Sequence, residues 1–423
     1  MISTPPPLTI NDRSYAWPDA PLVVICVDGS EPAYIEEAVK AGVMPYTAGM
    51  LAKGADLRAD CVVPSFTNPN NLSIVTGCPP SVHGICGNYI LDPDTGEEVM
   101  MNDPKYLRVG TIFKAFHDNG ARVAVVTAKD KLRTLLGHGL DFSSGRAVCF
   151  SSEKADQSTM KDNGIAGVLD MVGMPVPSVY SADLSEFLFA AGVKLLESYR
   201  PDIMYLSTTD YVQHKFAPGT EGANSFYAMM DGYWAKLSEL GATIAITADH
   251  GMSAKHGPDG QPKVIYLQEI LNDWLGEDAC RVILPITDPY VVHHGALGGY
   301  GTVYLPENTD AAALCKRIAG IDGVETALTK TEACTRFGLP PERVGDIVVI
   351  SVEDTAIGTS PERHDLSGLN EPLRSHGGLS EQRVPLLFNA PVIGDIDQRK
   401  IRNFDIFDIA LNQLRGRAER IAS

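Results

Sequence analysis

The stretch Leu22-Val23-Val24-Ile25-Cys26-Val27-Asp28-Gly29-Ser30 decides the fold. Its leading residues are all apolar, which indicates a buried strand, and an aspartate and a glycine follow where the strand must end. In open α/β sheets, ligands bind in the crevice outside the carboxyl ends of the strands. We therefore expect Asp28 to lie at a functional site.

Two later strand ends carry aspartate and histidine. Residues 203–207 form an apolar run before Asp210, and residues 242–247 form another before the dipeptide Asp249-His250. His214 follows Asp210 at an i,i+4 interval, which places both side chains on one face of a helix. Since all three strand ends should open into the same crevice, their side chains should meet there.

A metal centre is the chemistry that this set favours, with His376 as its last member. Imidazole nitrogen and carboxylate oxygen both bind zinc, although the same ligands would accept manganese or iron. Two metal ions roughly 4 Å apart can hold the attacking and leaving groups of an in-line displacement. Each residue alone also fits a plainer role, such as a helix cap or a loop histidine. The joint placement at strand ends favours two metal ions.

A nucleophile candidate lies at the start of a predicted helix. Residues 64–71 read Pro-Ser-Phe-Thr-Asn-Pro-Asn-Asn, and residues 72–76 continue in a helical pattern. A hydroxyl at a helix start has backbone N–H groups nearby that can hold a phosphoryl oxygen, and contact with a metal would activate it. Thr67 fits this role. The alternative is that Thr67 only caps the helix.

Composition bounds the class of protein. The 423 residues are 44% hydrophobic, which suffices for one large α/β core and a smaller unit. The 53 acidic residues outnumber the 35 basic ones and give a net charge of -18, which argues against nucleic acid and anionic membranes as partners. No run reaches the about 18 apolar residues of a membrane span. The eight cysteines form no C-x-x-C pair, so we expect buried free thiols in a soluble, cytoplasmic protein.

The order of elements predicts two structural units. Strands and helices alternate from residue 22 to about residue 257, which predicts a mostly parallel central sheet flanked by helices. One of these helices is expected at residues 106–119, and a final helix is expected at residues 405–415. Residues 261–365 instead follow a βαββαβ-like order, which predicts a small α+β domain inserted as a cap over the site. Residues 1–260 and 366–423 would form the catalytic core.

Together the motifs resemble those of the alkaline phosphatase superfamily. The Asp-Gly strand end, P-S-x-T-x-P-N at residues 64–70, D-x-x-x-H at 210–214, D-H-G-M at 249–252 and H-G-G at 376–378 occur in the family's order. The chain is similar to the nucleotide pyrophosphatase/phosphodiesterase branch and, most closely, to the phosphonoacetate hydrolases. The resemblance covers nearly the whole chain and implies an alkaline-phosphatase-like core with a cap.

The resemblance also implies roles for individual residues. One zinc ion would be held by Asp210, His214 and His376, and the other by Asp28, Thr67, Asp249 and His250. Asn88 would donate to a phosphoryl oxygen, and Lys129 and Lys131 would bind a substrate carboxylate. From the residues alone, Asn88 is equally a turn asparagine, and the lysines are a solvated turn.

The implied activity is hydrolysis of the C–P bond of phosphonoacetate to acetate and phosphate through a phosphothreonine, in a possible homodimer. A phosphodiesterase or phosphomonoesterase of the same fold is the alternative, and it would use Phe66 and Tyr89 to stack a nucleotide base. A zinc-binding protein without activity is disfavoured by the nucleophile candidate. Cofactor-independent phosphoglycerate mutase shares the core but uses a serine nucleophile.

Overall fold

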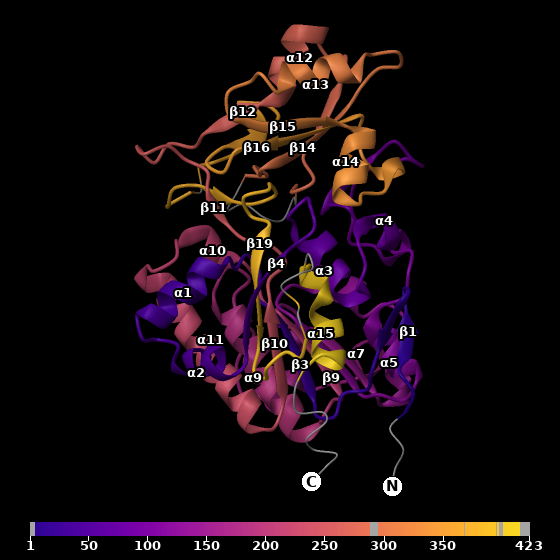
Figure 1. Cartoon of the computed structure of the whole chain (residues 1–423), viewed down its shortest axis with the longest axis vertical. Coiled ribbons are helices and arrows are strands. Elements are labelled where there is room, and N and C mark those ends of the chain that lie inside the picture. The colour runs from indigo at the N-terminus through magenta and orange to yellow at the C-terminus, as the bar shows by residue number, and fades with distance from the viewer. Residues whose placement is uncertain (1–4, 288–294, 368, 395, 397–400, 415–423) are drawn as a thin grey trace.

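A seven-stranded sheet forms the centre of the larger part of the molecule (Figure 1). The computed structural model describes residues 5–287, 295–367, 369–394, 396 and 401–414. The strands of this sheet are β3 (Leu22–Cys26), β4 (Ala55–Asp60), β7 (Val123–Thr127), β8 (Ala147–Ser151), β9 (Ile203–Ser207), β10 (Thr243–Thr247) and β19 (Arg383–Phe388). They lie in the order β4-β19-β10-β3-β9-β7-β8. Only β19 runs antiparallel to its neighbours, which confirms the mostly parallel sheet.

Helices cover both faces of the sheet. One face carries α1 (Pro32–Lys40), α2 (Pro45–Lys53), α9 (Asp183–Ser198) and α11 (Glu221–Glu239), and the other carries α3 (Thr67–Thr76), α5 (Ile112–Asp118), α6 (Asp130–Leu136) and α15 (Ile406–Asn412). Alternate residues of β3 point to opposite faces, so Val24 packs in one hydrophobic cluster and Ile25 packs in the other. Both faces of β3 are buried, which explains its continuous apolar sequence.

Two helix boundaries differ from those expected. The helix expected at residues 106–119 begins at Ile112, because the Thr111 hydroxyl accepts a hydrogen bond from the backbone N–H of Lys114 and caps the helix there. The final helix, α15, ends at Asn412, and residue 415 lies outside the described residues. The Thr111 cap thus sets the start of α5, which the apolar periodicity alone placed too early.

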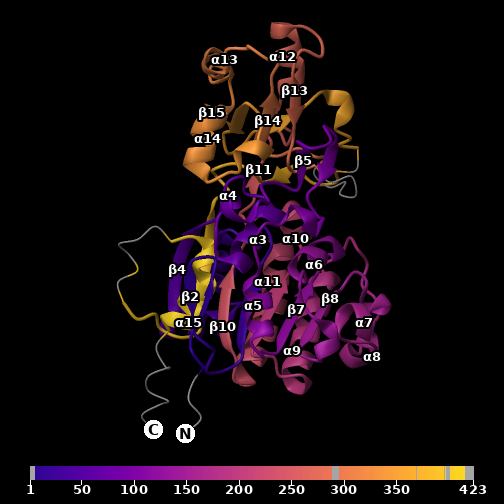
Figure 2. The same cartoon turned by 90° about the vertical axis from the view of Figure 1, so that its right-hand side faces the viewer.

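A second, four-stranded antiparallel sheet lies beyond the carboxyl ends of the parallel strands (Figures 1 and 2). Its strands are β13 (Arg281–Ile283), β14 (Tyr300–Tyr304), β15 (Val324–Thr329) and β16 (Ile347–Ser351), and its helices are α12 (Leu267–Leu275), α13 (Ala311–Ile318) and α14 (Lys330–Phe337). The first strand of the expected βαββαβ order, β12 (Val264–Tyr266), is not in this sheet. It pairs in parallel with β17 (Ala356–Gly358), which returns beside it. The division at residues 261–365 stays a prediction.

The two short strands at the base of the second sheet bring its entry and exit together. In β11 (Ser253–Ala254) and β18 (Arg374–Ser375), Ser253 lies opposite Ser375 in an antiparallel pair. The backbone N–H of Lys255 donates to the carbonyl of Leu373 at 2.8 Å. Because of this pairing, the segment that carries His250 lies beside the segment that carries His376.

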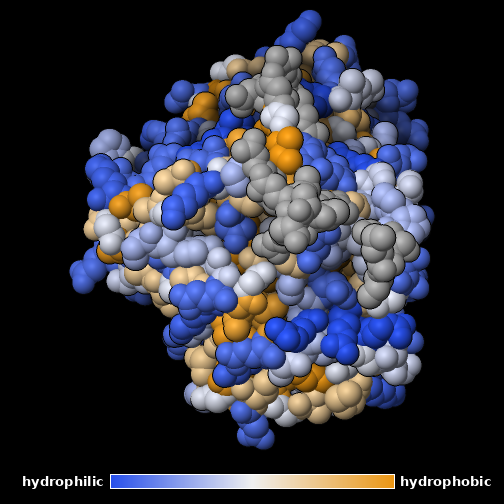
Figure 3. All heavy atoms as spheres, turned by 60° about the horizontal axis from the view of Figure 1, so that its bottom comes forward, coloured by the Kyte–Doolittle hydropathy of each residue, from blue (hydrophilic) through white to orange (hydrophobic). Residues whose placement is uncertain are grey.

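The surface and the cysteines agree with the composition. Hydrophilic residues cover most of the face in Figure 3, with hydrophobic residues scattered among them.

All eight cysteines are free, and all but Cys334 are buried, which confirms the expected thiols. Within the described parts of the chain, no helix has the length and apolar character needed to cross a membrane.

Candidate metal centre and nucleophile

The three strand ends singled out in the sequence are neighbours in the sheet. Strand β3 lies between β10 and β9, and its last residue, Cys26, pairs with Thr247 on one side and with Ser207 on the other. Asp28, Asp210 and Asp249 follow these three strands. Their convergence is therefore a direct result of the strand order.

Asp28, Asp249 and His250 form the first cluster of ligand atoms, which all lie within 4.8 Å of one another. Nε2 of His250 is 3.3 Å from Oδ1 of Asp28 and 3.9 Å from Oδ2 of Asp249. The hydroxyl oxygen of Thr67 is 3.4 Å from the same Nε2. The four residues implied to hold one metal ion thus meet around His250.

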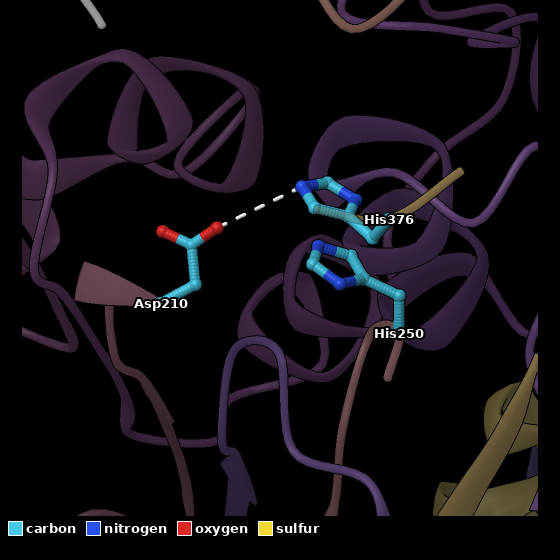
Figure 4. Close-up of side chains that lie close together, drawn as sticks. All are labelled: Asp210, His250 and His376. Atoms are coloured by element: carbon cyan, nitrogen blue, oxygen red, sulfur yellow. Dashed lines mark ion pairs between the residues drawn. The ribbon is translucent and has the colours of Figure 1, made fainter. Parts of the chain in front are cut away.

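Asp210 is the centre of the second cluster. Its Oδ2 lies 2.9 Å from Nε2 of His214 and 3.8 Å from Nε2 of His376. Figure 4 shows Asp210 facing His376, with His250 beside it. The rings of His250 and His376 stack at 3.6 Å between centroids with 6° between planes. The two clusters are therefore adjacent, and Asp210, His250 and His376 also form a group of their own.

Each of the three histidines is oriented by a backbone carbonyl. Nδ1 of His214, His250 and His376 lies 2.8–2.9 Å from a carbonyl oxygen. These oxygens belong to Arg374, Gly251 and Ser65, respectively. Because Nδ1 must carry the hydrogen in such a bond, Nε2 keeps its lone pair toward the carboxylates. Burial, with the nearby His250 and His214, also lowers the pKa of His376 well below its usual value, which favours the neutral form that binds metals.

The carboxylates require a positive partner. Burial, with the Asp249 and Asp210 carboxylates nearby, raises the pKa of Asp28 well above its usual value. Oδ1 of Asp28 is buried and accepts no hydrogen bond from the described residues. A buried carboxylate oxygen without a donor is costly unless a cation binds it. Mixed carboxylate and imidazole ligands fit divalent metal ions, so the residues present suit the predicted metal centre.

Asn71 supports the centre, although the sequence analysis did not identify it. Its side-chain nitrogen donates to Oδ2 of Asp249 at 3.0 Å and to the carbonyl of Thr67 at 3.1 Å. Its side-chain oxygen accepts from the hydroxyls of Tyr205 and Ser207. Asn71 follows Thr67 at an i,i+4 interval, and this spacing was the signal that could have revealed its orientation toward the site.

Thr67 is not a helix cap. It is the first residue of α3, the N-cap position is occupied by Phe66, and no side chain caps this helix end. The capping alternative is therefore wrong. The preceding loop is anchored because the Ser65 hydroxyl donates to the carbonyl of Gly378 at 2.7 Å. The Thr67 hydroxyl thus lies at the first residue of α3, within 3.4 Å of Nε2 of His250.

A cavity of about 90 Å³ opens beside the two clusters. It is lined by Asp28, Thr67, Asn68, Asn88, Met100, Lys129, Lys131, Leu132, Thr208, Thr209, Asp210, Ile286 and His376. The side-chain oxygen of Asn88 accepts from the backbone N–H of Asn68 at 3.0 Å. This bond leaves the amide nitrogen of Asn88 as the atom that can donate into the cavity.

Lys129 and Lys131 line the same cavity as Asp28, Asp210 and His376. Nζ of Lys129 donates to the carbonyl of Val179 at 3.4 Å and lies 5.5 Å from the ring centroid of Tyr180. Burial, together with the positive charge of Lys129, lowers the pKa of Lys131 to about 8. Two lysine side chains in one cavity attract an anion, so the cavity combines candidate metal ligands with cationic groups.

The aromatic slot that a nucleotide would need is not formed by the predicted residues. Phe66 is fully buried and packs edge-on against Tyr300 and His376. Tyr89 does not line the cavity. His256 lies in a two-residue bridge with Pro262 and does not belong to either cluster. His293 and His294 lie outside the described residues.

Solved structures of one protein are similar to the whole chain. They are a phosphonoacetate hydrolase from Sinorhizobium meliloti 1021 in complex with phosphonoformate and with phosphonoacetate. The identities are 60% and 59%, and the TM-score is 0.94 for both. Each comparison covers 97% of this chain and 99% of that chain. The likeness therefore includes both sheets.

A family model and curated relatives give a broader match. The model of type I phosphodiesterase / nucleotide pyrophosphatase matches residues 22–379. An ectonucleotide pyrophosphatase/phosphodiesterase of Caenorhabditis elegans is 35% identical over 83 residues, which are 19% of this chain and 10% of the relative. An uncharacterised pyrophosphatase/phosphodiesterase of Schizosaccharomyces pombe is 23% identical over 267 residues, which are 59% of this chain and 48% of the relative. The chain thus spans less than half the length of these curated relatives.

A substitution at Gly29 tests how tightly the segments that follow β3 and β9 pack against each other. It has φ of 71°, and a Cβ there would lie 3.1 Å from Cβ of Asp210 and 3.2 Å from Cβ of Gln213. Gly29→Ala should therefore cost the backbone strain of about 1–2 kcal/mol and an additional overpacking cost of about 1–3 kcal/mol. It should also weaken metal binding at the predicted centre, because the added Cβ would push Asp210 away from the Asp28-Gly29 segment. Denaturant unfolding and zinc titration measure the two effects.

Gly42→Ala is the matched control for this change. Gly42 has φ of 76°, but a Cβ there would have no heavy atom within 4 Å. It should show the backbone strain alone and keep the native zinc affinity. Equal zinc affinity in both variants would show that the approach of Asp210 to Gly29 does not matter for the metal centre.

Proposed function

We propose that this chain, which belongs to the type I phosphodiesterase / nucleotide pyrophosphatase family, is a metal-dependent hydrolase of the C–P bond of phosphonoacetate. The observation that carries this proposal is one cavity lined both by candidate metal ligands and by Lys129 and Lys131. Phosphonoacetate has a phosphonate at one end and a carboxylate at the other. The 60% identity to a phosphonoacetate hydrolase over nearly the whole chain supports the same substrate.

The proposed cofactors are two zinc ions. Asp210, His214 and His376 would hold one, and Asp28, Thr67, Asp249 and His250 would hold the other. When bound, the metal ions would supply Lewis acidity that neutralises the phosphonate charge and makes the Thr67 hydroxyl easier to deprotonate. The carbonyl contacts of the three histidines support this assignment, because they aim all three Nε2 atoms at the carboxylates.

The chain's own residues provide the displacement chemistry. The Thr67 hydroxyl gives up its proton to solvent as Oγ1 attacks phosphorus and forms the new O–P bond, and the P–C bond breaks with its electron pair moving to carbon. That charge spreads into the carboxylate as an enolate, which Lys129 and Lys131 stabilise where it develops. Asn88 donates to a phosphoryl oxygen. The enolate takes a proton from solvent to give acetate, and water then cleaves the phosphothreonine to release phosphate and restore Thr67.

The alternative is a phosphodiesterase or phosphomonoesterase that uses the same metal centre. The family description and the curated relatives favour it. An ester substrate has no carboxylate for the two lysines, and Phe66 is buried rather than open for stacking. The lysine pair therefore favours phosphonoacetate. The cytoplasmic location, the homodimer and the cap domain at residues 261–365 stay predictions.

Phosphate release from phosphonoacetate and from a phosphomonoester, together with nitrophenol release from a phosphodiester, tests the proposal directly. Purified, zinc-loaded protein is compared on phosphonoacetate, a nitrophenyl phosphodiester and a phosphomonoester, each with and without a chelator. We expect chelator-sensitive release that is fastest from phosphonoacetate. Release from the esters alone would keep the metal centre but assign the enzyme to the phosphodiesterase or phosphatase activity.

Thr67→Ala tests the nucleophile. Loss of the attacking oxygen should lower kcat for phosphonoacetate by about 10⁴-fold or more, while zinc content stays near the native value. Thr76→Ala is the matched control, because it removes the same hydroxyl at the other end of α3 and should keep native turnover. A zinc-replete Thr67→Ala variant with native turnover would remove Thr67 from this role.

Lys129→Ala combined with Lys131→Ala tests recognition of the carboxylate. A hydrogen bond between charged groups contributes about 1.5–3 kcal/mol, so kcat/KM for phosphonoacetate should fall by at least about 100-fold. Hydrolysis of nitrophenyl phosphate should change far less. The exposed pair Lys40→Ala with Lys53→Ala controls for the change in net charge. An equal loss on both substrates would show that the lysines do not read the carboxylate.

A further inference from the structure

A buried ion pair between Lys255 and Glu381 lies beside the proposed metal centre. Nζ of Lys255 is 2.9 Å from Oε1 of Glu381, and the two residues are 0% and 1% exposed. Lys255 follows the segment of His250, and Glu381 follows the segment of His376. Neither residue lines the cavity, so the pair does not contact the substrate.

Glu381 is bonded to the backbone next to both histidines. Its Oε2 accepts from the N–H of Gly378 at 2.8 Å, close after His376. Its carbonyl accepts from the N–H of Gly251, the residue after His250, at 2.7 Å. One glutamate thus connects the two histidines whose rings stack at 3.6 Å and which belong to different proposed metal ions.

Lys255 adds a connection to the four-stranded sheet. Its Nζ donates to the carbonyl of Glu353 at 2.7 Å, in the segment between β16 and β17. The ammonium therefore holds the Glu381 carboxylate and the backbone of the second sheet at the same time. Loss of either partner would leave the other as a buried charge without its counter-ion, which is strongly unfavourable.

The segment between His376 and Glu381 has little freedom to shift. Gly377 has φ of 122°, and a Cβ there would lie 2.5 Å from Cε1 of Phe66. The N–H of Gly299 also donates to the carbonyl of His376 at 2.8 Å. In backbone packed this closely, a displacement of Gly378 must move His376 as well.

Stability alone does not account for the ion pair. A buried ion pair removes two charges from water, and a well-packed apolar pair of similar volume is often equally stable. An apolar pair would lack the directional bond from Glu381 to Gly378. We propose that Lys255 and Glu381 are positioning residues that fix His250 relative to His376 and so set the spacing of the two metal sites. This inference rests on the metal centre of the proposed function.

Zinc affinity of the full-length protein tests the positioning role. Lys255→Met removes the ammonium at similar length, and Glu381→Gln removes the charge while its amide oxygen can still accept from Gly378. Competition with a chromophoric chelator gives the dissociation constants of both zinc ions. Loss of groups that orient metal ligands typically lowers affinity about 10- to 100-fold, and we expect Lys255→Met to weaken both sites in this range. Glu381→Gln should weaken both sites less.

Leu196→Ala is the control for a purely structural effect. Leu196 is buried in α9 and packs in the hydrophobic cluster on the far side of the sheet from α3. It should lower Tm and keep both native zinc affinities. If Lys255→Met does not fold, Glu381→Gln decides the question.

Zinc dissociation constants within about twofold of native in the folded ion-pair variants, despite a lowered Tm, would overturn the positioning role. Zinc binding by the native protein distinguishes a failure of the proposed metal centre from a failure of the positioning role. If the native protein binds no zinc, both the proposed metal centre and the positioning role are wrong. If it binds two zinc ions and the variants bind them equally well, only the positioning role is wrong.

Discussion

Repulsion among Asp28, Asp210 and Asp249 is the constraint on which the site depends. The strand order β10-β3-β9 forces the three carboxylates together at one buried edge. Burial and mutual repulsion raise the pKa of Asp28, so the charged cluster is unfavourable until cations lie between the oxygens. The strand order therefore concentrates negative charge at this edge of the sheet. Cations bound between the carboxylates would neutralise that charge, and the histidine nitrogens would complete their ligand sets.

The orientation of the ligands comes from backbone far away in sequence. The His214 ring is held by the carbonyl of Arg374, and the His376 ring by the carbonyl of Ser65. The nucleophile loop is held in turn by the Ser65 hydroxyl bond to Gly378. Hydrogen bonds thus connect the loop before Thr67, the histidine ligands and residues 376–378. A displacement of one of these segments should therefore displace the others.

Sequence predicted the parts of the site that depend on local pattern. Asp28, Asp210 and Asp249 each follow an apolar strand, and parallel strands must open at the same edge. Asn71 and Glu381 were not predicted, because their contacts with Asp249 and Lys255 arise only when segments more than 100 residues apart are packed together. The pairing of β12 with β17 was missed for the same reason, since a three-residue strand carries no signal for its partner.

The pairing of β11 with β18 has an evolutionary consequence. The chain leaves the core after Ala254 and returns at Arg374, and the N–H of Lys255 bonds the carbonyl of Leu373 across the gap. Since the ends of this excursion are already joined, its length and content can change without altering the distance that the core must close. Such a junction lets the length of the excursion vary, while the contacts of Lys255 with Glu353 and Glu381 limit what can change at its base.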